Sequence, residues 1–272
     1  MWIRSFPLSI ALCLGLASLP SPVESRPVRG RSPVPITPPS SPSPPLAQTS
    51  AEYFLNSGVE KAQKGDWPGA IEDFTLALRF DPNYAKAYNN RGTAYGQLGE
   101  FQKAIEDFTR ALRLDPNYAE AYSNRGTVYG ELGEPQKAIE DFTRSLRLDP
   151  NYAKAYYNRG LAYFQLGEFQ KAIEDYNRAL RLAPNLAEAY NNRGAAYGRL
   201  GEPQKEIEDY NRALRLAPNY AEAYYNRGLV YGQLREFQKA REDWQKAADL
   251  FQRQGNLGAY RQVLGSLEKL PR

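Results

Sequence analysis

The sequence predicts an all-α fold in which short helix-turn-helix units stack into a solenoid. The first reason is repetition, because nearly the same thirty-four residues recur six times between residues 51 and 254. The second is spacing, because apolar and small residues in each copy recur three and four positions apart, as on a helical face. A period of about twenty to fifty residues indicates stacked units that share their core with neighbours.

The copy from Ala85 to Tyr118 shows how one unit is built. It contains two segments of helical spacing, and Gly99 lies in the break between them. The Asp-Pro-Asn run at 115–117 follows the second segment, where proline prevents the helix from continuing. Each unit is therefore predicted as two helices joined by a turn. The six units are predicted to span residues 51–84, 85–118, 119–152, 153–186, 187–220 and 221–254.

The last unit departs from this pattern at two positions. Arg235 replaces the turn glycine, and Gln252 replaces the proline that ends the other units. Without that proline, the second helix can continue past Leu250. Residues 255–272 are then predicted to form a capping helix, since their apolar side chains share one helical face. Such a helix would cover the open end of the stack.

The first fifty residues have a different composition from the repeats. Residues 1–25 carry one early charge, Arg4, followed by an apolar stretch of signal-peptide length. An alternative is an uncleaved membrane anchor at residues 5–19. Residues 26–50 are rich in Pro and Ser, which predicts a disordered linker. We expect an exported protein, either periplasmic or extracellular.

Composition restricts the chemistry that the chain can perform. The net charge of +4 resides at the ends, since residues 51–254 carry 28 basic and 29 acidic side chains. The chain has no histidine, and its one cysteine, Cys13, lies in the leader. Histidine is the most common general base and metal ligand. A Glu-Asp pair, such as Glu106-Asp107, recurs in every unit, whereas a catalytic site normally occurs once in a chain. We therefore predict no catalytic residues, no metal site and no cofactor.

The repeated unit resembles the tetratricopeptide repeat (TPR) family. The match is carried by residues at the family's fixed offsets, which in the second unit are Tyr88, Arg91-Gly92, Tyr95, Ala104, Phe108, Ala111 and Pro116. The resemblance covers residues 51–254. It implies a right-handed superhelical solenoid whose first helices line a concave groove. It also implies a non-catalytic scaffold for protein–protein interaction.

An arginine occupies a semi-buried position where the family usually has leucine. It recurs at 91, 125, 159, 193 and 227, and an aspartate recurs in every unit. A buried charge needs a partner. The first unit has Ser57 in place of the arginine but keeps Asp73. We therefore expect each arginine to pair with the aspartate of the preceding unit, as Arg91 with Asp73.

The groove positions implied by the resemblance hold a row of asparagines and three aromatic residues. The predicted peptide-binding residues are Asn90, Asn124, Asn158, Asn192, Asn226, Tyr157, Phe164 and Tyr225. An amide offers both a donor and an acceptor, so such a row could pair with the backbone of an extended peptide. The alternative is that the asparagines bond structurally to the backbone of neighbouring repeats.

The predicted function is therefore a scaffold that binds an extended peptide or a partner protein. Two alternatives remain open at this point. One is an RNA-binding helical repeat, which the nearly neutral repeats disfavour, so we expect no nucleic-acid partner. The other is a non-catalytic subunit of an envelope enzyme or assembly complex. The sequence does not fix the oligomeric state.

Overall fold

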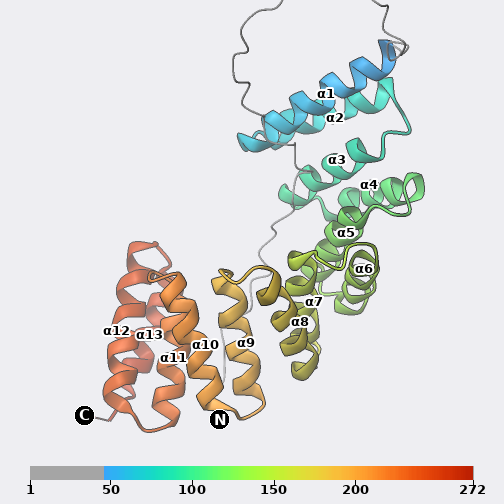
Figure 1. The fold of residues 1–272 in the computed structure, drawn as a ribbon. Coiled ribbons are helices and arrows are strands. Elements are labelled where there is room, and N and C mark those ends of the chain that lie inside the picture. Colours follow the sequence, from blue (N-terminus) through green and yellow to red (C-terminus); the bar gives the residue numbers. More distant parts are fainter. Residues whose placement is uncertain (1–45, 272) are drawn as a thin grey trace, which may run out of the picture. The chain divides into compact units, whose positions relative to one another are not determined.

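A computed structural model describes residues 46–271, and every regular element in this range is an α-helix (Figure 1). The helices are α1 (Leu46–Gln63), α2 (Trp67–Phe80), α3 (Ala85–Gln97), α4 (Phe101–Leu114), α5 (Ala119–Glu131), α6 (Pro135–Leu148), α7 (Ala153–Gln165), α8 (Phe169–Leu182), α9 (Ala187–Arg199), α10 (Pro203–Leu216), α11 (Ala221–Gln233), α12 (Phe237–Arg253) and α13 (Leu257–Glu268). The predicted all-α fold of helix-turn-helix units is confirmed.

The predictions for the N-terminal region fall largely outside this range. The signal peptide at 1–25, the alternative anchor at 5–19 and the linker up to residue 45 are not among the described residues. Helix α1 takes in residues 46–50, which the sequence had assigned to the linker. None of the helices within residues 46–271 combines the length and apolar character that a membrane crossing requires.

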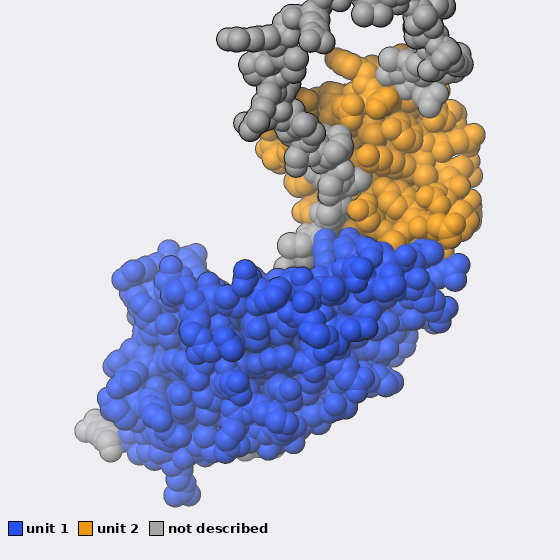
Figure 2. Space-filling model, in the orientation of Figure 1, with its two compact units in different colours: residues 1–11, 129–272 blue, residues 12–128 orange. Residues whose placement is uncertain are grey.

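The described residues form two compact units, 46–128 and 129–271 (Figure 2). In the first unit, α1 pairs with α2 and α3 pairs with α4, while α2 packs on α3. In the second unit, the helical hairpins are α7–α8, α9–α10 and α11–α12, and α8 packs on α9 as α10 packs on α11. Each unit is therefore a row of helical hairpins that share their core with the next hairpin.

Glycine and alanine allow the two helices of a hairpin to approach closely. In the fourth repeat, Gly160 of α7 faces Tyr176 of α8, and Ala172 is fully buried beside them. A Cβ placed on Gly160 would lie 2.7 Å from the Tyr176 ring. The hairpin can therefore form at this spacing because residue 160 has no side chain.

The turns follow the chemistry expected of their residues. Gly99, between α3 and α4, has a φ of 75°, a left-handed conformation that glycine adopts without strain. Arg235 occupies the same place in the last repeat with a φ of 61°. After α4, the backbone N–H of Asn117 donates to Asp115 Oδ1 at 2.9 Å. This bond fixes the short connection to the next hairpin.

The C-terminal end of the stack is covered as predicted. Helix α12 is 17 residues long, whereas the preceding second helices have 14. The side chain of Asn256 then caps α13 by accepting from the N–H of Ala259 at 3.1 Å. Ala259 and Val263 of α13 are buried against a cluster that includes Phe251. Helix α13 thus covers apolar surface that would otherwise be exposed.

Candidate peptide-binding face

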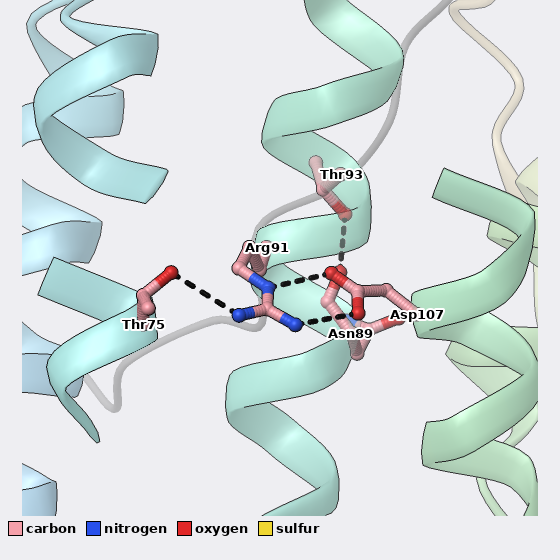
Figure 3. Close-up of polar contacts among 5 residues, drawn as sticks. All are labelled: Thr75, Asn89, Arg91, Thr93 and Asp107. Atoms are coloured by element: carbon pink, nitrogen blue, oxygen red, sulfur yellow. Dashed lines mark hydrogen bonds and ion pairs between the residues drawn. The ribbon is translucent and has the colours of Figure 1, made fainter. Parts of the chain in front are cut away.

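Four of the repeated arginines, at 91, 159, 193 and 227, pair with the aspartate of their own hairpin. Arg91 of α3 donates to Asp107 of α4 twice, at 2.7 Å from Nε and 2.8 Å from Nη2 (Figure 3). Its Nη1 donates to Thr75 Oγ1 on the preceding hairpin at 3.1 Å. The expected pairing of Arg91 with Asp73 is therefore wrong. The preceding hairpin instead supplies a hydroxyl group.

The same arrangement recurs in the compact unit of residues 129–271. Two bonds join each of the pairs Arg159–Asp175, Arg193–Asp209 and Arg227–Asp243. The third bond goes to the preceding hairpin, and its acceptors are Thr143, Asn177 and Asn211, respectively. Two parallel hydrogen bonds to one carboxylate match the planar geometry of the guanidinium group. The arginine therefore joins the two helices of one hairpin and connects them to its neighbour.

The contacts of Asp73 in the first repeat explain why it does not pair with Arg91. Asp73 is paired with Lys61 at 2.8 Å and accepts from Ser57 Oγ at 2.6 Å, both from its own hairpin. The lysine and serine together replace the arginine that this repeat lacks. Asp73 was therefore never available to Arg91.

These charged pairs are structural features. Burial raises the pKa of Asp107, and the hydrogen bonds and charge of Arg91 act in the opposite direction. Asp175 and Asp209 show the same balance. Three repeats thus hold equivalent carboxylates in equivalent surroundings, so none of the three is distinguished as a catalytic group.

One face of each first helix carries side chains that differ between repeats. Positions four and seven residues apart lie on the same helical face. In α3 this face holds Asn89, Thr93 and Gly96; in α7, Tyr157, Leu161 and Phe164; in α9, Asn191, Ala195 and Gly198; and in α11, Tyr225, Leu229 and Gly232. The packing positions around this face remain nearly unchanged.

The predicted asparagine row forms hydrogen bonds from one first helix to the next. Asn124 Nδ2 donates to Asn89 Oδ1 at 3.1 Å in the first unit. In the second unit, Asn192 Nδ2 donates to Tyr157 Oη at 2.9 Å, and Asn226 Nδ2 donates to Asn191 Oδ1 at 3.2 Å. We call these contacts the amide ladder. Its amides link adjacent repeats through side chains rather than through the neighbouring backbone.

The ladder residues differ in their exposure. Asn90, Asn124, Asn158 and Asn192 are buried, whereas Asn226 is partly exposed. In the part of the chain that the structure describes, Asn90 Nδ2 is buried and has no hydrogen-bond partner. The residue in the first repeat that would receive its bond is Leu55, which is apolar and buried. The ladder therefore ends at the first repeat.

The three predicted aromatic residues have different surroundings. Tyr157 is half-buried beside Tyr176, with ring centroids 6.0 Å apart. Phe164 is half-buried and packs edge-on against Phe169 at 5.1 Å. Tyr225 is only 3% exposed. Its hydroxyl accepts a hydrogen bond from Gln262 of α13, so Tyr225 is both buried and bonded within the protein.

Glu206 lies beside Gly198 of α9 and was not among the predicted binding residues. Glu206 lies on α10, where the equivalent residues of the other repeats are alanines, namely Ala70, Ala104, Ala138, Ala172 and Ala240. Its side chain covers Gly198 of α9, and a Cβ placed on that glycine would lie 2.4 Å from Glu206 Oε1. Tyr210 Oη donates to the same oxygen at 3.2 Å. The signal that could have found Glu206 is the substitution of glutamate for a repeated alanine.

Burial raises the pKa of Glu206 to about 7, although the hydrogen bond from Tyr210 lowers it. Burial also raises the pKa of Tyr210 well above its usual value. Within the described residues, no group of three or more acidic, histidine or cysteine side chains could hold a metal ion.

Comparison with family models agrees with the repeated geometry. A model described as "Tetratricopeptide repeat" matches residues 85–118, 119–152, 187–220 and 221–253, and a second model of that description matches 142–174. A model described as "TPR repeat" matches 58–99, 160–201 and 207–234. The chain belongs to the tetratricopeptide repeat family. No match was found among curated proteins.

Solved TPR structures show the same fold. The chain is 32% identical to a protein titled MamA, covering 64% of this chain and 94% of that one, with a TM-score of 0.55. PilW, described as a type IV pilus biogenesis factor, is 23% identical, with 79% and 98% covered and a TM-score of 0.71. YrrB, described as a TPR protein with an unusual peptide-binding site, is 22% identical, with 65% and 95% covered and a TM-score of 0.54.

Proposed function

We propose that the chain is a non-catalytic scaffold that holds an extended peptide, or an extended segment of a partner protein, along the face of its first helices. The observation that carries this proposal is the contrast between constant packing and variable surface. The Arg–Asp pairs, the packing glycines and the buried alanines recur from repeat to repeat. The first-helix face changes from small and polar on α9 to aromatic on α7.

The proposed peptide contacts are most distinct on α7. Phe164 occupies the position that is glycine in α3, α5, α9 and α11. It is half-buried, so part of its ring can accept an apolar side chain. Partly desolvated aromatic residues often dominate the binding energy of an interface. Tyr157 lies on the same face of α7.

In this proposal, the amide ladder forms the polar floor of the binding face. Its members keep neighbouring first helices in register through the bonds already described. Asn226 is the partly exposed member and is the first candidate for a direct bond to the ligand backbone. Because such bonds would go to the ligand backbone, the ladder would bind peptides without selecting among their side chains.

A peptide-retention experiment tests the proposal. The immobilised full chain is exposed to a pool of short extended peptides with blocked ends. We expect retention to fall for Phe164→Ala and to be unchanged for Leu182→Ala. Leu182 is the matched control, since it is an apolar residue of the same repeat, 39% exposed, on the second helix. Equal retention by Phe164→Ala and the native chain would contradict the proposed face.

We also propose that the protein is exported, on the basis of the apolar stretch after Arg4. Blocking signal processing in the native cell should then leave a longer precursor. The N-terminal sequence of the mature protein would give the cleavage site. An unprocessed chain recovered with the membrane would instead support the anchor at residues 5–19.

A further inference from the structure

Among residues 46–271, no cation pairs with the carboxyl group of Glu206. Within the described residues, its one hydrogen-bond partner is Tyr210, which is a neutral donor. The residue is only partly exposed, and this burial raises the pKa of its carboxyl group. An ionised carboxylate in such a place is costly unless a cation or several donors accompany it.

The nearby cations are already committed to other groups. Lys205, the adjacent residue on α10, pairs with Glu202. On α9, Arg193 pairs with Asp209, and the guanidinium of Arg199 lies 4.7 Å from the centroid of the Phe169 ring. None of these three side chains pairs with Glu206, and no cation contributes to the shift in its pKa.

Glu206 also places its charge on the proposed binding face. Gly198 lies seven residues after Asn191 and three after Ala195, on the face of α9 that corresponds to Tyr157 and Phe164 on α7. The carboxyl group fills the space above Gly198, and the residue remains partly exposed. The position that holds a phenyl ring on α7 thus holds a carboxyl group on the next hairpin.

From this geometry we infer that Glu206 is a specificity-determining residue, which receives a lysine or arginine side chain of the bound peptide. The inference rests on the proposed function, because it requires a peptide on the first-helix face. A basic side chain would supply the missing countercharge, while the Tyr210 hydroxyl holds the carboxyl group in place. Phe164, one repeat earlier, would contact an apolar side chain of the same ligand.

The chain offers well-matched variants for a test. Glu206→Ala introduces the residue that the other five repeats carry, so the hairpin should fold. Glu206→Gln keeps the size of the side chain and removes its charge. Glu208→Ala removes an exposed glutamate two residues away and is the control for net charge. Thermal unfolding of each variant verifies that it is folded.

Two pools of blocked short peptides provide the probe. They have the same random composition, except that each peptide contains one lysine in the first pool and one norleucine in its place in the second. The full native chain should retain the lysine pool about tenfold more strongly than the norleucine pool, as expected for a charge-assisted hydrogen bond. Glu208→Ala should keep this preference. Glu206→Ala and Glu206→Gln should retain both pools equally.

The outcomes separate this inference from the proposed function. If the native chain retains both pools equally, or if Glu206→Ala keeps the preference, the role of Glu206 is wrong while peptide binding stands. If the native chain retains neither pool, peptide binding itself is contradicted, and the role of Glu206 falls with it.

Discussion

Arg193 holds Asp209 with two parallel hydrogen bonds, 2.7 Å from Nε to Oδ2 and 2.6 Å from Nη2 to Oδ1. Asp209 is only 3% exposed, so its charge depends on this partner. The pair joins the two helices of one hairpin, and the remaining Arg193 nitrogen, Nη1, bonds to Asn177 of the previous one. The charge that appears anomalous in the sequence is therefore a link between repeats.

Replacing Arg193 with leucine should destabilise the fold strongly. The substitution leaves the Asp209 carboxylate buried and unpaired, which costs about 3–5 kcal/mol. Urea denaturation followed by circular dichroism measures the loss. The double variant Arg193→Leu, Asp209→Ala should recover part of it, because no unpaired charge remains. A loss below about 1 kcal/mol in the single variant would mean that the pair contributes little.

Gly160→Ala should also destabilise the chain, by about 1–3 kcal/mol, because the new methyl group would overlap the Tyr176 ring. Gly265 on α13 provides the control, since a Cβ there would meet no atom within 4 Å. Gly265→Ala should be neutral or stabilise the helix by up to about 1 kcal/mol. Equal effects of the two substitutions would contradict the close approach of α7 and α8.

Arg235→Gly should stabilise the last hairpin by about 1 kcal/mol. Arg235 adopts a left-handed conformation that strains any residue with a Cβ, and the equivalent turn residues are glycines. The reciprocal change, Gly99→Ala, should cost a similar amount. Thermal unfolding compares the two variants, and a lower melting temperature for Arg235→Gly would show that the arginine side chain has a stabilising contact.

Asn192→Ala should lower stability by roughly 1–2 kcal/mol, because it removes the bond between the α9 amide and the Tyr157 hydroxyl. Peptide retention is measured on the same samples. An unchanged melting temperature with weaker retention would show that Asn192 contacts the ligand more than it links the helices.

Glu206 should make stability depend on pH between about 5 and 8. Burial raises its pKa in the folded state from 4.5 to about 7, so the folded form binds the proton more tightly than the unfolded form. Protonation of Glu206 therefore stabilises the folded state. This stabilisation is complete below the pKa of the residue in the unfolded chain and is lost as pH rises through 7. At pH 8, Glu206→Ala should therefore be more stable than the native chain by up to about 3 kcal/mol. The difference in unfolding free energy between the two chains should narrow at pH 5. A difference that does not change with pH in urea denaturation would contradict this prediction.

The repeated parts of the fold could be predicted from the sequence because they obey local rules. Helical spacing, the turn at Gly99 and the proline at 116 each have a local physical cause, and the structure shows the corresponding helices and turns. The capping helix could also be predicted, because Gln252 removes the stop that the other repeats carry.

The pairing of charges could not be predicted in the same way. Arg91 lies 18 residues after Asp73 and 16 before Asp107, so the repeat spacing alone allows either partner. The choice depends on which helix packs beside which, and on Lys61, whose role as a substitute partner appears only in three dimensions. Glu206 was missed for a related reason, since a glutamate on a highly charged helix looks like a solvated residue until its packing is known.

Covalent mapping of the bound peptide tests the central claim most directly. A pool of blocked peptides, each carrying one photoreactive phenylalanine analogue, is bound to the full chain and irradiated, and the attachment sites are identified by mass spectrometry. The account predicts attachment on the first-helix face, concentrated at α7 and α9 around Tyr157, Phe164 and Ala195. Attachment confined to the second helices α8, α10 and α12 would contradict it.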